Sequence, residues 1–211
     1  MHNGNGCEKL AQPKQSIGTC SRGSDQNTSP MPPEPPPAPW HDFFVAVNAA
    51  LQETVEVHCL GAFVATVLYG APHETSDVDF LPLTEKGHAA LLSEVGGKGS
   101  PIHITHGVYL HPVGIASLPD AYEERLIAIF PSLYTKLRLF GLDAHDLALS
   151  KLDRNSDRDQ EDVLHLAQRV PLLPDLLERR YRDEMRPWLP NVERHDLTMR
   201  LLLEMIREIA G

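Results

Sequence analysis

The feature that most constrains the fold is a strand that ends in a glycine, followed by a short helix and a second strand. Val55–Leu60 alternates in polarity and is rich in β-branched residues, which predicts a strand. Gly61 ends that strand, and the apolar stretch Ala62–Tyr69 is expected to form a short helix closed by Gly70. The chain then returns into a second predicted strand over Val78–Leu81. This order is typical of a mixed α/β fold.

The rest of the chain extends the same mixed order. Helices are predicted over residues 42–53, 84–95 and 119–129. Strands are predicted over residues 102–105, 108–113 and 134–140. Thr84 is the expected N-cap of the helix over residues 84–95. The first two of these strands are expected to form a hairpin near Gly107, and the chain is expected to be helical from Asp143 onward. The predicted fold class is therefore α/β (α+β), with a small mixed sheet, helices around it and a helical C-terminal part.

The N-terminal segment differs in composition from the rest of the chain. Residues 1–39 are polar and then proline-dense, which predicts a disordered proline-rich tail. The folded region is expected to divide into a first domain over residues 40–170 and a helical C-terminal extension over residues 171–211. The C-terminal extension begins where prolines first interrupt the helical pattern.

Composition excludes several classes of protein. Hydrophobic residues make up 42% of the 211-residue chain, which is enough to bury a core. No apolar stretch approaches the roughly 20 residues of a membrane helix, and the N-terminus does not resemble a signal peptide. Three cysteines are too few for a disulfide framework. A net charge of −10 argues against a broad nucleic-acid-coating surface. We therefore expect a cytoplasmic protein with no membrane partner.

Two carboxylates are the main candidates for chemistry. Asp77 and Asp79 are two residues apart on a predicted strand, so their side chains point to the same face. Adjacent carboxylates repel unless a cation neutralises them, and their oxygens suit Mg²⁺ (or Mn²⁺). Gly61 opens a helix whose backbone N–H groups can face a phosphate. The pattern indicates metal-assisted phosphoryl or nucleotidyl transfer; the alternative is a solvated strand end without a metal.

Two stretches resemble a known group of enzymes. Gly61-Ala62 followed by Ser76-Asp77-Val78-Asp79 resembles the first motif of the polymerase-β-like nucleotidyltransferase superfamily. The stretch 146–163, with its Asp-Leu-Ala-Leu-Ser-Lys-Leu run, resembles a motif of the AbiEii toxin-like branch and, more closely, of a bacterial nucleotidyltransferase-like family near it. The resemblance covers about residues 42–170.

The resemblance implies an Mg²⁺-dependent transfer from an NTP to an RNA or protein acceptor, with an antitoxin protein as a partner. It implies that Asp77 and Asp79 are catalytic and bind the metal. It also implies a set of nucleotide-binding residues: Gly61, Ala62, Ser76, Lys151, Arg154 and Arg158. Asp159 and Asp162 complete the later motif. Ala62 replaces the glycine or serine usual in the family, which keeps a backbone N–H but removes a hydroxyl.

The later motif allows two interpretations. One unbroken helix over residues 146–167, at about 100° per residue, places Lys151, Arg154 and Arg158 on one basic stripe. Alternatively, the helix breaks at Asn155 and Ser156 caps a second helix, in which case no such stripe forms. The cations are then also explained by surface pairs with nearby aspartates.

A third carboxylate, usual in active members of the superfamily, is missing from the expected strand. Residues 108–113 contain no Asp or Glu, and His111 is the nearest polar group. Asp120 or Asp162 would have to converge on the pair from elsewhere. The spacing of His103, His106 and His111 also allows the hypothesis of a zinc site. The alternative function is a catalytically degenerate nucleotidyltransferase-like binding module that lacks the third carboxylate.

Overall fold

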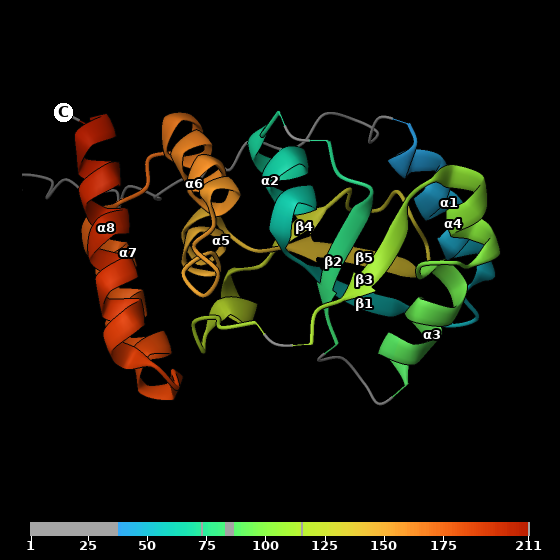
Figure 1. Cartoon of the computed structure of the whole chain (residues 1–211). Helices are drawn as coiled ribbons and strands as arrows, with labels where there is room; N and C mark the ends of the chain where they lie inside the picture. Colours follow the sequence, from blue (N-terminus) through green and yellow to red (C-terminus); the bar gives the residue numbers. More distant parts are fainter. Residues whose placement is uncertain (1–37, 73, 83–86, 115, 211) are drawn as a thin grey trace, which may run out of the picture.

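The described residues form a five-stranded sheet with helices packed around it, and the C-terminal helices lie to one side of it (Figure 1). The computed structural model describes residues 38–72, 74–82, 87–114 and 116–210, so the prediction for the N-terminal tail lies almost wholly outside the described residues. The strand order is β3-β2-β1-β5-β4. The strands are β1 (Val55–Cys59), β2 (Asp77–Leu81), β3 (Tyr109–Pro112), β4 (Ile127–Ile129) and β5 (Leu137–Gly141).

Parallel and antiparallel neighbours alternate across the sheet. β2 is antiparallel to β1, while β3 runs parallel to β2. On the other side of β1, β5 is parallel to it and β4 is antiparallel to β5. The sheet is mixed and helices surround it, so the predicted α/β (α+β) class is confirmed.

The two faces of the sheet differ in what covers them. Val57, Phe80 and Leu110 point to one face and are buried, because α1 (Trp40–Ala50) and α2 (Gly61–Tyr69) pack there. Residues that alternate with them point to the other face, which is more open; they include Glu56, His58, Asp77, Asp79, Tyr109 and His111. Polar side chains on β2 and β3 are therefore accessible without a break in the core.

The predicted hairpin over residues 102–105 and 108–113 is wrong. Residues Pro101–His106 form helix α4, which begins at Ser100, whose side chain accepts a hydrogen bond from the backbone N–H of His103. Pro101 occupies the first turn, where its missing N–H costs nothing. β3 follows alone and pairs in parallel with β2, so there is no hairpin.

The predicted helix over residues 119–129 is also wrong. A single 3-10 turn, η1 (Tyr122–Arg125), is followed by an extended Leu126 and the three-residue edge strand β4. β4 is a strand because it pairs with β5. β5 itself begins three residues later than predicted. Helix α3 (His88–Gly96) confirms most of another predicted helix, whose proposed cap Thr84 lies outside the described residues.

The C-terminal part is helical, as predicted, and packs beside α2 (Figure 1). It contains α5 (Ala144–Leu149), α6 (Asp157–Arg169), α7 (Pro174–Arg180), a π-helical turn (Tyr181–Met185), a 3-10 turn (Arg186–Trp188) and α8 (Val192–Ala210). Its buried residues belong to the same hydrophobic cluster as those of the sheet. The described helices include none that is long and apolar enough to cross a membrane.

A buried charge cluster connects the helices to the sheet. Asp146 on α5 is fully buried and accepts two hydrogen bonds from Arg125, at 2.8 and 3.2 Å, and one from Arg180 at 2.9 Å. Arg125 also pairs with Glu184, and Arg180 with Asp143. Burial raises the pKa of Asp146 despite the hydrogen bond from Arg125, so its ionised form depends on both arginines.

Replacing Arg125 should destabilise the fold strongly. In Arg125→Met the buried Asp146 carboxylate retains only one of its two arginine partners, Arg180. Breaking a buried ion pair lowers the free energy of unfolding by about 3 kcal/mol. Arg182→Met is the matched control, because Arg182 pairs with Asp183 at an exposed position where such pairs contribute less than about 1 kcal/mol. Urea denaturation of both variants measures the difference. Equal costs would contradict this role for the cluster.

Candidate functional site

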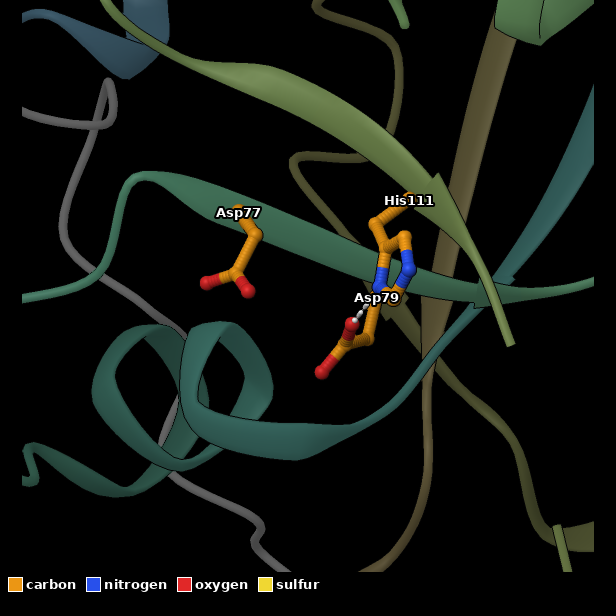
Figure 2. Close-up of side chains that lie close together, drawn as sticks. All are labelled: Asp77, Asp79 and His111. Atoms are coloured by element: carbon orange, nitrogen blue, oxygen red, sulfur yellow. Dashed lines mark hydrogen bonds and ion pairs between the residues drawn. The ribbon is translucent and has the colours of Figure 1, made fainter. Parts of the chain in front are cut away.

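Asp77, Asp79 and His111 form a group of potential ligands on the open face of the sheet. Both carboxylates project from β2 on the same side, and the His111 ring leans from β3 toward Asp79 (Figure 2). His111 Nδ1 lies 2.8 Å from Asp79 Oδ1. One ligand atom of each residue lies within 4.8 Å of the others. The predicted convergence of the two aspartates is confirmed, and a histidine joins them.

His111 reaches the pair because β3 is parallel to β2. The register places His111 beside Asp79 and Tyr109 beside Asp77. Neighbours in this register point to the same face, so both β3 side chains border the carboxylates. Burial, and then the negative charges of Asp77 and Asp79, raise the pKa of Tyr109. The local field is thus negative, as a cation site requires.

Gly61 lies against the carboxylate of Asp79. Its φ is +72°, and a Cβ added there would lie 2.5 Å from Asp79 Oδ2. A side chain at this position would therefore strain the backbone and displace the carboxylate. Gly61 is also the first residue of α2, whose first-turn N–H groups have no partner within the helix. The helix N-terminus and the aspartate are in this way held next to each other.

The residues that precede β2 support its first carboxylate. The Thr75 hydroxyl donates a hydrogen bond to Asp77 Oδ1. Ser76 is exposed, and its backbone carbonyl accepts a hydrogen bond from the N–H of Tyr109 at 2.9 Å. Ala62 is half-buried in the first turn of α2. Thr75 was missed in the sequence; the available signal was a hydroxyl two residues before an aspartate, which is common at turns.

The later motif is split between two helices. α5 ends at Leu149 and α6 begins after Ser156, so the interpretation as a single helix is wrong. Ser156 and Asp159 form the capping box of the alternative interpretation, with the backbone N–H of Asp159 donating to Ser156 Oγ and that of Ser156 to the Asp159 carboxylate. Lys151, Arg154 and Arg158 consequently share no helical stripe.

The three cations of the motif have different surroundings. Lys151 is buried, and its ammonium lies 2.6 Å from Asp162 and 3.5 Å from Asp159. Arg154 donates to Asp159 at 2.6 Å, yet its side chain is 75% exposed. The pKa of Arg154 is raised by its hydrogen bond to Asp159 and, less strongly, by the charge of Asp79. Arg158 is exposed in the first turn of α6.

The expected third carboxylate is not found among the described residues near the pair. Asp120 accepts a hydrogen bond from the indole N–H of Trp188 at 2.7 Å, and Asp162 is engaged with Lys151. Neither belongs to the group that His111 joins, and neither do His103 and His106 on α4. Within the part of the chain that the structure describes, His111 therefore stands where the third carboxylate was sought.

Comparison with known proteins assigns the chain to a family. Residues 61–204 match the family described as nucleotidyltransferase of unknown function (DUF6036). The match covers more than half of the chain, which therefore belongs to this family of nucleotidyltransferases. It begins at Gly61 and includes most of the C-terminal helices. Neither a curated protein nor a solved structure matches the chain.

Gly61→Ala should disturb the site more than an equivalent change at the other end of α2. Gly70 has a similar φ of +68°, but a Cβ there meets nothing within 4 Å. Backbone strain should destabilise both variants by about 1 kcal/mol, and only Gly61→Ala should also displace the Asp79 carboxylate. The NMR chemical shifts of the His111 imidazole should change in Gly61→Ala and stay the same in Gly70→Ala. Identical spectra in the two variants would refute the close contact.

Asp159 should stabilise the protein in a pH-dependent way. Burial raises the pKa of Asp159, but hydrogen bonds from Arg154 and Ser156 outweigh it and lower the pKa from 3.8 to about 2. The stabilisation is present above about pH 4 and is lost as the pH falls toward 2. Asp159→Asn should therefore lower the unfolding free energy by about 2 kcal/mol at pH 7.

The pH dependence separates this role from a general loss of charge. Unfolding in urea at pH 7, 4 and 3 should show the gap between wild type and Asp159→Asn closing as the pH falls. Asp157→Asn is the control, since Asp157 is an exposed carboxylate in the same helical turn. A gap that stays constant down to pH 3 would contradict the lowered pKa.

Proposed function

We propose that this protein is a metal-dependent nucleotidyltransferase that transfers a nucleotidyl group from an NTP to a hydroxyl of an acceptor. The observation that carries the proposal is the placement of Asp79 against Gly61, at the N-terminus of α2, with Asp77 on the same face of β2. This arrangement brings a cation site and an anion site together, which is what a metal-bound triphosphate requires. Membership of the nucleotidyltransferase family supports the same reaction class.

The residues present fit a divalent cation. Three potential ligand atoms lie within 4.8 Å of one another, and two of them are carboxylate oxygens. Asp77 and Asp79 would hold Mg²⁺ or Mn²⁺, which would bind the triphosphate and neutralise charge that develops on it. In the reaction the acceptor oxygen would bond to the α-phosphorus, and the bond from that phosphorus to the oxygen that bridges it to the β-phosphate would break. Pyrophosphate would leave, and the proton of the acceptor hydroxyl would pass to solvent water.

The chain's own groups supply binding and orientation. The backbone N–H groups of Gly61 and Ala62, with the hydroxyl of the exposed Ser76, would face the phosphates. Arg154 fits a phosphate contact best among the three motif cations, because its guanidinium is exposed and lies within the electrostatic reach of Asp79. Arg158 is also accessible. Lys151, as a buried partner of Asp162, would act by positioning α6.

The acceptor is proposed from the resemblance to the AbiEii branch. That resemblance supports an RNA or protein acceptor and a toxin-like role with an antitoxin partner. It also supports the proposed division of the folded region at residue 170. These points rest on the likeness of the two motifs, whereas the reaction class rests on the site.

A second candidate function is a binding module that has lost catalysis. The observation that favours it is that a histidine stands where a third carboxylate was sought, among the residues that the structure describes. Such a module would bind nucleotide without transferring it. The same assay separates the two functions.

The test is a transfer assay with each of the four α-³²P NTPs, Mg²⁺ or Mn²⁺, and total RNA or a protein extract as acceptor. Wild type should label an acceptor, and Asp77→Asn and Asp79→Asn should each lower the rate by at least about 100-fold, because each removes a charge that holds the cation. Glu56→Gln is the control, since Glu56 is a carboxylate on the same face of the sheet, exposed and paired with Arg138.

The outcomes are distinct. Labelling by wild type and Glu56→Gln, and its loss in both aspartate variants, would establish the transferase, and the labelled species would identify the acceptor. Binding of an NTP without labelling would favour the degenerate module. Labelling that survives in both aspartate variants would refute the proposed site.

A further inference from the structure

The geometry around Asp79 already resembles two ligands of one ion. His111 Nδ1 and Asp79 Oδ1 are 2.8 Å apart. Neighbouring ligands of an octahedral ion at about 2.1 Å are separated by about 3.0 Å. Asp77 completes a group whose ligand atoms lie within 4.8 Å of one another.

The orientation of these side chains is fixed by their surroundings. Gly61 packs against Oδ2 of Asp79, which leaves Oδ1 directed at His111. The parallel register of β2 and β3 holds the imidazole beside the carboxylate, and about half of the His111 side chain is exposed to solvent. A carboxylate only accepts hydrogen bonds, so His111 donates the 2.8 Å hydrogen bond from Nδ1–H to Asp79. An ion that enters from the open face would replace this proton between Nδ1 and the carboxylates, and the imidazole would then carry its proton on Nε2.

The donor set has consequences for which ion binds. Mg²⁺ prefers oxygen ligands and gives up water reluctantly, whereas imidazole nitrogen suits first-row transition metals. We propose that His111 is the third protein ligand of the metal site and that it makes the site selective for Mn²⁺ over Mg²⁺. This inference rests on the proposed function, because it concerns the same two carboxylates, but it concerns ion binding and does not require turnover.

The test measures ion binding in the absence of nucleotide. Mn²⁺ binding to the full chain is followed by electron paramagnetic resonance and calorimetry, and Mg²⁺ is titrated as a competitor. Wild type should bind Mn²⁺ at least about tenfold more tightly than Mg²⁺, the scale on which site residues tune metal affinity. In His111→Asp this preference should fall by at least about tenfold, because a third carboxylate restores an all-oxygen site.

A spectroscopic signature identifies the ligand directly. Bound Mn²⁺ should show electron spin echo modulation from a ¹⁴N nucleus in wild type, and the modulation should vanish in both His111→Asp and His111→Ala. His106→Asp is the matched control: it introduces the same charge from a half-buried histidine on α4 that is outside the ligand group. This variant should keep both the nitrogen signal and the preference for Mn²⁺. Circular dichroism checks that each variant is folded.

Three results would overturn the inference. One is a nitrogen signal that survives in His111→Asp and His111→Ala. Another is an unchanged ratio of Mn²⁺ to Mg²⁺ affinity in His111→Asp, although Asp77→Asn abolishes binding of the ion. The third is a wild-type protein that binds neither ion. The failure of the proposed function looks different: ion selectivity and its loss in His111→Asp would persist while no NTP is transferred.

Discussion

A buried carboxylate held by two arginines connects the two parts of this molecule. Asp146 lies on the first helix after the sheet, Arg125 lies just before the edge strand β4, and Arg180 ends α7. Each arginine reaches Asp146 from a different segment, so the sheet and the later helices are fixed relative to α5 by one charged centre. α5 and α6 also contact α2, so this centre lies where the later helices join the part of the molecule that carries Gly61.

Local patterns in the sequence were enough to predict the elements that form the site, and not those that depend on distant partners. β1, α2 and β2 follow from alternation, a glycine and a short apolar run, all of which act between near neighbours. The run Ile102–Thr105 alternates in polarity and is rich in β-branched residues, which is typical of a strand, yet Ser100 and Pro101 begin a helix there. β4 has only three residues and is a strand because β5 lies beside it.

The same distinction applies to the candidate site. That Asp77 and Asp79 share a face follows from the period of a strand, so the sequence alone predicted it. The place of His111 follows from the parallel pairing of β3 with β2, and the hairpin expected there would have placed it beside another strand. Pairs between the cations of the later motif and nearby aspartates could be predicted. The burial of the Lys151–Asp162 pair could not, because the break before α6 decides whether Lys151 faces solvent or Asp162.

The contact between Gly61 and Asp79 links two positions that are distant in the sequence. The carboxylate occupies the space that a side chain at position 61 would need, so each residue limits what the other position accepts. A chain that loses Asp79 gains room at position 61, and asparagine or aspartate, which tolerate a positive φ, then fit there. Loss of the glycine together with the aspartate is therefore a mark, visible in sequence alone, of relatives that lack the carboxylate pair on this face of the sheet.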